Sequence, residues 1–274
     1  MARLEALLTR RGALLILFIV ILVLSTYVFT YRQSSKTQSE PPLPTPSTTA
    51  GKVKYPQDYT IVMVGDSMTE TLGNSTEIKK FLADYYPGKS FEVLNYGFGA
   101  TNILSVMDRL TKETEHGRKF RPILDIDYDL ILIESFGQNP LSEYKLEEGL
   151  QHQSEELDKV VSILQEKNPT GKIVFVATIS PNKEIFAKNQ VDLSYEKRAE
   201  WVKERISYIK NHIEYGKAKF IPVINIFEKS LMDNGDGNPD YISTDDYIHP
   251  SPTGIIFISK EIAGFIYSNS IFPH

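Results

Sequence analysis

The chain has 274 residues, 41% of them hydrophobic and 24% charged, a composition typical of one well-buried globular domain with appendages. It contains no cysteine, which excludes disulfide bonds, a cysteine nucleophile, thiolate metal sites and a lipoprotein anchor. The net charge is −5, and because residues 1–32 carry +3, the remainder carries −8. That acidic balance argues against nucleic acid as a partner.

The N-terminal residues predict a membrane anchor. Gly12–Tyr31 contains no charged residue, and a helix of about 20 apolar residues crosses a hydrocarbon core of about 30 Å. Arg3, Arg10 and Arg11 precede this stretch, so the positive-inside rule places residues 1–11 in the cytoplasm. A cleaved signal peptide is the alternative, but its apolar region is usually only about 7–15 residues and ends at a small-x-small site. We therefore expect a single-pass protein of the cell membrane with its folded domain outside the cytoplasm.

A linker is predicted between this anchor and the folded domain. Residues 32–55 are rich in proline, serine and threonine and contain almost no large apolar side chains. This composition is typical of an extended, disordered tether. The folded domain is then expected to span residues 56–274.

The domain itself alternates short apolar runs with amphipathic stretches. The predicted strands are Tyr59–Val64, Phe91–Leu94, Leu130–Ile133, Ile173–Ile179 and Phe220–Ile224. The predicted helices are Glu77–Tyr86, Asn102–Thr111, Ser142–Lys167, Tyr195–Tyr215 and Thr253–Tyr267. Apolar runs without polar alternation indicate strands buried on both faces of a parallel sheet. The pattern predicts an α/β fold, a three-layer α/β/α sandwich around a five-stranded, mostly parallel sheet.

Polar residues follow the ends of three predicted strands. Ser67, Gly97 and Asn139 each come shortly after one of these apolar runs. In an open parallel sheet ligands bind beyond the carboxyl ends of the strands. The topology alone therefore gathers these three residues at one rim.

The segment Asp246-Tyr-Ile-His249-Pro250 predicts nucleophilic catalysis. A carboxylate three residues before a histidine can reach round a tight loop and accept the imidazole Nδ1–H. The other imidazole nitrogen, Nε2, then remains free to take a proton from a serine hydroxyl, and Ser67 is the candidate. Asp245 is adjacent to Asp246 but has a different spacing from the histidine.

Four segments in chain order resemble the motifs of the SGNH (GDSL) hydrolase superfamily: Gly65-Asp66-Ser67, Asn95-Tyr96-Gly97, Gly137-Gln138-Asn139 and Asp246 to His249. The resemblance spans nearly all of residues 58–254 and implies a flavodoxin-like SGNH hydrolase fold. It implies that Ser67, His249 and Asp246 form the catalytic triad. It also implies that Ser67 N–H, Gly97 N–H and the Asn139 amide form the oxyanion hole.

One position departs from this resemblance, because Pro140 stands where the family usually has an aspartate that supports the loop. Each segment also has a structural explanation: Gly65-Asp66-Ser67 and Asn139-Pro140 are typical of turns, and Asn102 of a helix cap. Glu134 has no predicted role beyond binding neighbouring backbone.

No metal or cofactor is predicted. The acidic run Asp233–Asp240 suggests calcium, but the glycine that an EF-hand loop requires at its sixth position is Pro239 here. We read this run as a turn-rich loop.

The predicted activity is hydrolysis of carboxylic esters through an acyl-enzyme on Ser67, with an ester substrate such as an acylated glycan or lipid. One alternative is an envelope glycan O-acyltransferase that uses the same triad. A second alternative is a non-enzymatic, membrane-tethered binding module, although such a module needs no Ser67, Asp246 and His249 together.

Overall fold

The structure is a computed structural model that describes residues 51–188 and 190–273. The predicted cytoplasmic tail (1–11), the predicted membrane segment (12–31) and residues 32–50 of the predicted linker lie outside these residues. In the described ranges, no helix combines the length and apolarity that a membrane crossing requires.

The compact unit of the chain begins at Gly51, five residues before the predicted domain boundary. Val53 forms a β-bridge with Ile126, and its N–H donates to Asp125 O at 2.7 Å. These contacts attach residues 51–55 to the domain, although their composition resembles that of the preceding linker.

A five-stranded, wholly parallel sheet forms the centre of the unit. Its strands are β1 (Tyr59–Gly65), β2 (Phe91–Gly97), β5 (Leu130–Glu134), β6 (Lys172–Ala177) and β7 (Val223–Asn225). Their spatial order is β2-β1-β5-β6-β7, so the direction of winding reverses between β1 and β5. Such a reversal leaves a crevice at the carboxyl ends of those two strands. The predicted α/β architecture is confirmed.

One predicted strand is shifted. The sequence places the last strand at Phe220–Ile224, whereas β7 covers Val223–Asn225. Phe220 is 95% exposed and has a φ of 56°, so it belongs to the turn that follows the preceding helix. Its aromatic side chain resembles a strand residue in composition, but the turn geometry excludes it from the sheet.

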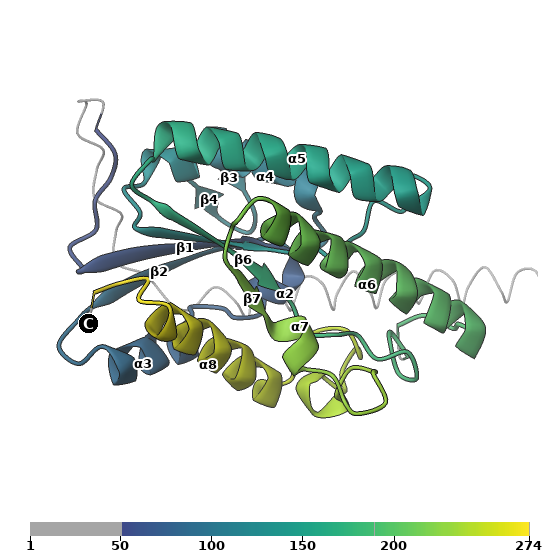
Figure 1. Cartoon of the computed structure of the whole chain (residues 1–274). Helices are drawn as coiled ribbons and strands as arrows, with labels where there is room; N and C mark the ends of the chain where they lie inside the picture. The colour runs from purple at the N-terminus through teal and green to yellow at the C-terminus, as the bar shows by residue number, and fades with distance from the viewer. Residues whose placement is uncertain (1–50, 189, 274) are drawn as a thin grey trace, which may run out of the picture. The chain divides into compact units, whose positions relative to one another are not determined.

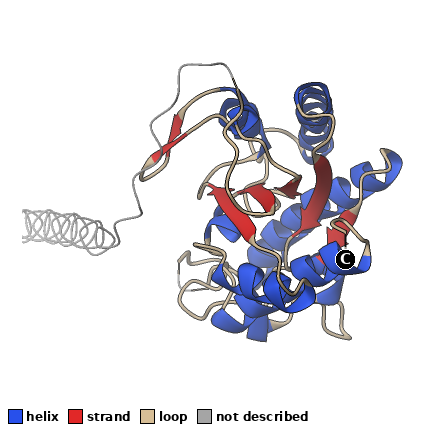
Figure 2. Cartoon of the chain, turned by 90° about the vertical axis from the view of Figure 1, so that its left-hand side faces the viewer, coloured by secondary structure: helices blue, strands red, loops and turns tan. Residues whose placement is uncertain are grey.

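Helices cover both faces of the sheet (Figures 1 and 2). They are α2 (Ser67–Glu70), α3 (Thr76–Tyr85), α4 (Val106–Thr111), α5 (Leu146–Lys167), α6 (Tyr195–Ala218), α7 (Ile226–Lys229) and α8 (Pro252–Ser268). The described residues also form three 3₁₀ turns, η1 (Ile103–Ser105), η2 (Ile123–Asp125) and η3 (Pro239–Tyr241). A short hairpin consists of β3 (Thr114–Glu115) and β4 (Lys119–Phe120). Figure 1 shows α4 and α5 on one face and α3 and α8 on the other.

The two faces of β1 explain this layering. Ile61 and Met63 pack into the core beneath α3 and α8, whereas Val62 and Val64 pack into the core on the α5 side. All four side chains are buried, as expected for a parallel strand covered on both sides. The rim where the strands end is therefore left for polar residues.

The last helix begins as its sequence predicts. Ser251 caps α8 by accepting the Gly254 N–H at 3.0 Å, and Pro252 occupies the first turn. His249 lies two residues before this cap, so the start of α8 helps to fix the loop that carries the histidine.

Candidate active site

The first site segment is the tight turn between β1 and α2. An added Cβ on Gly65 would lie 2.0 Å from Thr69 Oγ1, so only glycine lets the chain fold back here. Ser67 follows as the first residue of α2 and is partly exposed at the sheet rim. Its backbone N–H has no acceptor within the described residues.

Asp66 connects the first segment with the third. Its side chain is fully buried; Oδ1 accepts the Met68 N–H at 2.8 Å, and Oδ2 accepts Asn139 Nδ2 at 3.0 Å. Burial raises the pKa of Asp66, and the hydrogen bonds from Met68 and Asn139 oppose that shift. Asp66 thus holds the Asn139 amide beside Ser67.

The second segment connects the end of β2 to α2 and the turn after it through hydrogen bonds of Asn95. Asn95 Nδ2 donates to Thr69 O at 2.8 Å and to Gly73 O at 3.0 Å, while Asn95 Oδ1 accepts the Gly97 N–H at 2.8 Å. An added Cβ on Gly97 would lie 2.2 Å from Glu70 N. The close approach of α2 therefore requires glycine at this position, and the Gly97 N–H already has a partner.

The rest of this loop lies beside Ser67. An added Cβ on Gly99 would lie 3.7 Å from Ser67 Cβ. Phe98 N–H donates to Gly65 O and Gly99 N–H to Glu70 Oε2, whereas the Ala100 N–H has no acceptor in the described part of the chain. The φ of Ala100 is 56°, a conformation that a residue with a Cβ seldom adopts. Sequence reasoning missed Ala100, because its unusual backbone leaves no signal in an alanine.

The fourth segment brings His249 and Asp246 together. Asp246 Oδ2 lies 2.5 Å from His249 Nδ1, and Oδ1 accepts the N–H groups of Ile248 at 2.8 Å and His249 at 3.0 Å. Burial of Asp246 raises its pKa, but hydrogen bonds from the imidazole and the two N–H groups outweigh this and lower the pKa overall. Asp245 forms no side-chain bond to His249 within the described residues.

His249 acts electrostatically on the first segment, since burial raises the pKa of the Asp66 carboxyl and the charge of His249 is one of the effects that oppose this rise. Ser67 Oγ and His249 Nε2 form no hydrogen bond within the described residues, and such contacts often tighten only when substrate binds. Other histidines have different partners: His212 is buried against Phe175, and burial lowers its pKa to about 3.

Arg109 of α4 ties the segments together, and the sequence analysis did not identify it. Its side chain is buried, and Nη1 donates to Gly65 O at 2.6 Å and Tyr96 O at 2.8 Å. Nη2 donates to Thr101 Oγ1 at 2.5 Å and Ser105 Oγ at 2.6 Å. An arginine in an amphipathic helix usually faces solvent, so no sequence pattern could have singled it out.

Arg109 also lies over two aromatic rings. Its guanidinium carbon is 4.5 Å from the centroid of the Phe98 ring and 5.5 Å from that of Phe136. Arg109 binds Gly65 O in the first segment and Tyr96 O in the second, and Phe136 directly precedes the third, so one cation supports three of the four segments.

Among the described residues, no cluster of three or more histidine, aspartate or glutamate side chains could hold a metal ion. The turn-rich run Asp233–Asp240 ends in η3. The groups gathered at the rim are instead a hydroxyl, an imidazole with its carboxylate, and N–H donors, which suit acyl transfer.

Comparison with known proteins agrees with this chemistry. No curated protein matches the chain. The lipase/acylhydrolase from Enterococcus faecalis has a similar structure, with a TM-score of 0.55 and 18% identity, covering 77% of this chain and 96% of that one. A GDSL-like lipase from Bacteroides thetaiotaomicron gives a TM-score of 0.51 and 13% identity, covering 77% and 89%. The acetyl xylan esterase AlAXEase gives a TM-score of 0.54 and 12% identity, covering 76% of this chain and 99% of that one.

These structural neighbours share the fold, and the family itself is identified by sequence. The family of GDSL-like lipases and acylhydrolases matches residues 61–262, a range that contains all four site segments. The chain is therefore a member of the GDSL (SGNH) hydrolase family, an ester-hydrolysing enzyme.

Proposed function

We propose that this protein is a serine esterase that hydrolyses carboxylic esters through an acyl-enzyme on Ser67. The observation that carries the proposal is the 2.5 Å contact between His249 Nδ1 and Asp246 Oδ2. This contact orients the imidazole and leaves Nε2 as the base, as serine catalysis requires. The partly exposed Ser67 at the sheet rim is the nucleophile.

In the first step Ser67 Oγ attacks the ester carbonyl while His249 Nε2 takes the hydroxyl proton. The imidazolium, stabilised by Asp246, then gives that proton to the leaving alcohol as the ester C–O bond breaks. Water attacks the acyl-enzyme in the second step, His249 again acts as base, and the acid leaves with Ser67 restored. The scheme uses no metal and no cofactor.

We propose that the oxyanion is held by the Ser67 N–H, the Asn139 amide and the N–H of Ala100. Asn139 Nδ2 has two hydrogens and donates one of them to Asp66. Gly97, the donor expected from the family resemblance, would have to share an N–H that already bonds Asn95. Ala100 offers an N–H without an acceptor in the described residues, in the loop that lies beside Ser67.

Short acyl esters, including acetyl groups on glycans, are the proposed substrates. A structural neighbour named acetyl xylan esterase has the same fold, which makes acetylated glycans a reasonable first substrate class to test. Acylated lipids are the second class, because the predicted anchor would hold the enzyme at a membrane.

The test is Ser67→Ala assayed with p-nitrophenyl acetate. We expect turnover to fall to background with the fold intact, since the substitution removes the proposed nucleophile. Ser207→Ala on α6, a serine whose hydroxyl bonds only its own helix, is the matched control and should keep full activity. A folded Ser67→Ala protein with normal turnover would overturn the proposal.

A phosphonate inhibitor that reacts with Ser67 tests the oxyanion hole in a separate experiment on the wild type. Its phosphoryl oxygen should lie about 3 Å from the Ser67 and Ala100 nitrogens and from Asn139 Nδ2 in a crystal structure. Contact with the Gly97 nitrogen in place of Ala100 would restore the donor expected from the sequence.

A further inference from the structure

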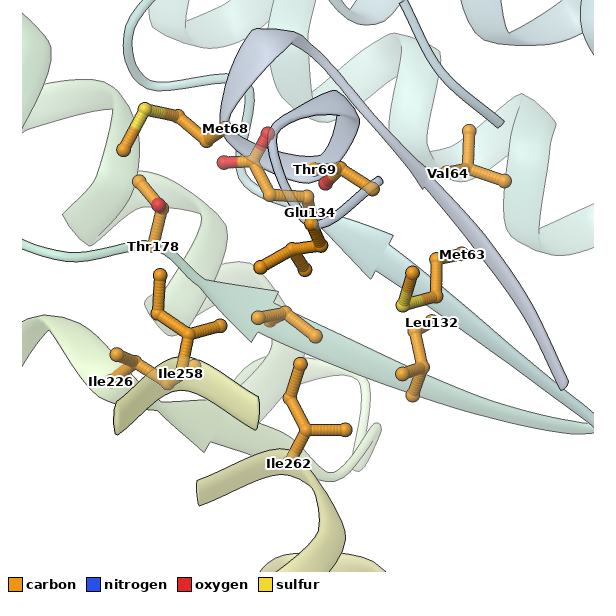
Figure 3. A pocket seen from close by; sticks show the side chains of 12 residues that line it. Met63, Val64, Met68, Thr69, Leu132, Glu134, Thr178, Ile226, Ile258 and Ile262 are labelled. Carbon is orange, nitrogen blue, oxygen red and sulfur yellow. The ribbon is translucent and has the colours of Figure 1, made fainter. Parts of the chain in front are cut away.

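Helix α2 has a buried side that packs into the domain. Figure 3 shows Met68 and Thr69 of this helix, together with Glu134, among the side chains that line a pocket. Glu134 ends β5, and its Oε2 accepts the Asp66 N–H at 3.3 Å. The start of α2 is therefore held against the end of β5.

The other side of α2 faces the sheet rim and carries Ser67 and Glu70, the more exposed residues of the helix. Residues three apart in a helix are neighbours on its surface. An added Cβ on Gly99 would lie 2.5 Å from Glu70 Oε2 and 3.7 Å from Ser67 Cβ, so both side chains border the same glycine. Glu70 therefore lies beside Ser67 and faces the loop formed by residues 98–100.

Both carboxylate oxygens of Glu70 are used. Oε2 accepts the Gly99 N–H at 2.8 Å, and Oε1 lies 2.8 Å from His116 Nε2. A carboxylate only accepts hydrogen bonds, so the imidazole proton in this contact is on Nε2. His116 belongs to the turn between β3 and β4. One carboxylate therefore joins α2, the loop 98–100 and the hairpin.

The hairpin also fixes the neighbouring residue of the loop. The His116 ring stacks on the buried Phe98 ring, with centroids 4.7 Å apart and an interplanar angle of 15°, and Phe120 of β4 meets the same ring edge-on at 4.7 Å. Phe98 and Gly99 are thus both held by side chains. Ala100 follows with a φ of 56°, a backbone that persists only where surrounding contacts impose it.

We propose that Glu70 and His116 form a positioning pair that holds the loop 98–100 so that the Ala100 N–H is directed toward the oxyanion. Glu70 acts through Gly99, and His116 acts through Glu70, so neither side chain touches the substrate. The link to catalysis rests on the proposed esterase function, whereas the hold on the loop does not.

A surface pair that only stabilises the fold is the alternative. The exposed fractions of the two side chains are 34% for His116 and 44% for Glu70, and pairs with so much exposure contribute little to global stability. A positioning pair instead changes kcat while KM and the free energy of unfolding stay nearly constant.

Glu70→Ala removes both contacts of the carboxylate. We expect kcat to fall by about 10- to 100-fold with KM within about twofold of wild type, because a displaced oxyanion donor acts on the transition state alone. Glu113→Ala is the matched control, since Glu113 pairs with Lys119 of the same hairpin at 2.8 Å, and it should leave both constants near wild type. Urea unfolding checks that stability is retained.

Glu70→Gln is the conservative variant that should rescue the rate. Its amide oxygen can accept the Gly99 N–H, and its NH₂ can donate to His116 Nε2 once the imidazole proton moves to Nδ1. We therefore expect kcat within about threefold of wild type.

His116→Phe keeps a ring over Phe98 but removes the contact with Glu70. We expect kcat to fall by about three- to tenfold, since Glu70 loses one of its two partners. Because His116 acts through Glu70, the double variant Glu70→Ala/His116→Phe should be no slower than Glu70→Ala alone. Losses that multiply in the double variant would overturn the inference.

Hydrogen exchange reports on the loop without any enzyme activity. Mass spectrometry of the peptide that contains Gly99 compares the full-length wild type with Glu70→Ala and Glu113→Ala. The Gly99 amide should exchange about tenfold faster in Glu70→Ala, because its N–H loses the acceptor. Glu113→Ala should exchange as wild type does.

Failure of the inference and failure of the proposed function give different results. A wild type without esterase activity contradicts the proposed function, and the exchange measurement still tests the hold on the loop. Unchanged exchange in Glu70→Ala overturns the inference whatever the activity. In an active enzyme, the positioning role is wrong if Glu70→Ala keeps a normal kcat or if Glu70→Gln is as slow as Glu70→Ala.

Discussion

Two aspartates of the site have opposite roles because their surroundings differ. Asp66 has no exposed surface and its pKa is raised by burial, so its hydrogen bonds hold the loop that carries Asn139. Asp246 is partly exposed and accepts three hydrogen bonds, and its pKa is lowered overall. Among the described residues only Asp246 contacts His249 Nδ1, so we propose Asp246 as the carboxylate of the triad.

Replacement of Asp246 by asparagine should lower kcat by about 10⁴-fold, because the amide favours the wrong imidazole tautomer. Asp245→Asn is the matched control and should leave kcat near wild type. Circular dichroism and p-nitrophenyl acetate turnover measure fold and rate. A larger loss in Asp245→Asn would show that the wrong carboxylate has been assigned.

The lowered pKa of Asp246 also has a pH signature. Its folded pKa lies below the unfolded value of 3.8, so its contribution to stability is present above that value and is lost as pH falls through the folded one. Asp246→Asn should therefore lose stability mainly at neutral pH. Activity should decline in acid for a separate reason, because protonated His249 cannot accept the Ser67 proton.

At the scale of elements, three loops of the site share an unusual backbone. Ala100, Phe136 and Tyr247 have φ values of 56°, 54° and 58°, and each lies on a different loop. Such conformations persist only where surrounding contacts impose them. Arg109 supplies part of those contacts, since it binds Thr101 and lies over the Phe136 ring.

Arg109→Lys should therefore reduce both stability and kcat. A single ammonium cannot reach the four oxygens that the guanidinium binds, so buried hydrogen bonds are lost. We expect a loss of about 2–4 kcal/mol in the free energy of unfolding by urea titration, typical of a broken buried network. Arg118→Lys, whose side chain is exposed over Phe120, is the matched control and should be near neutral.

At the scale of the whole molecule, the sequence still predicts that residues 12–31 anchor the enzyme in a membrane. We propose that the hydrolase domain lies outside the cytoplasm. Protease added to intact cells should then cut between Pro41 and Ala50 and release a soluble, active fragment. The compact unit that begins at Gly51 supports the expectation that this fragment stays folded.

Two controls decide the orientation. Full-length protein that resists protease in intact cells and is cut only after lysis would mean that the topology is inverted. A mature N-terminus that lacks residues 1–31 would mean that this segment is a cleaved signal peptide.

The sequence by itself determined the α/β class, the five strands and the order of the four site segments. Buried parallel strands leave continuous apolar runs such as Ile61–Val64, and a catalytic Asp–His pair on one loop has a fixed spacing. The last strand was misplaced because Phe220 has the composition of a strand residue and the geometry of a turn.

Only the tertiary structure decided how these segments are held. Arg109, Glu134 and Ala100 act through contacts with residues distant in the chain, or through a backbone angle, and neither property is encoded in local pattern. The close approach of α2 to Gly97 was likewise decided by packing between elements. Local spacing fixes which chemical groups are present, whereas long-range packing fixes which of them are free to react.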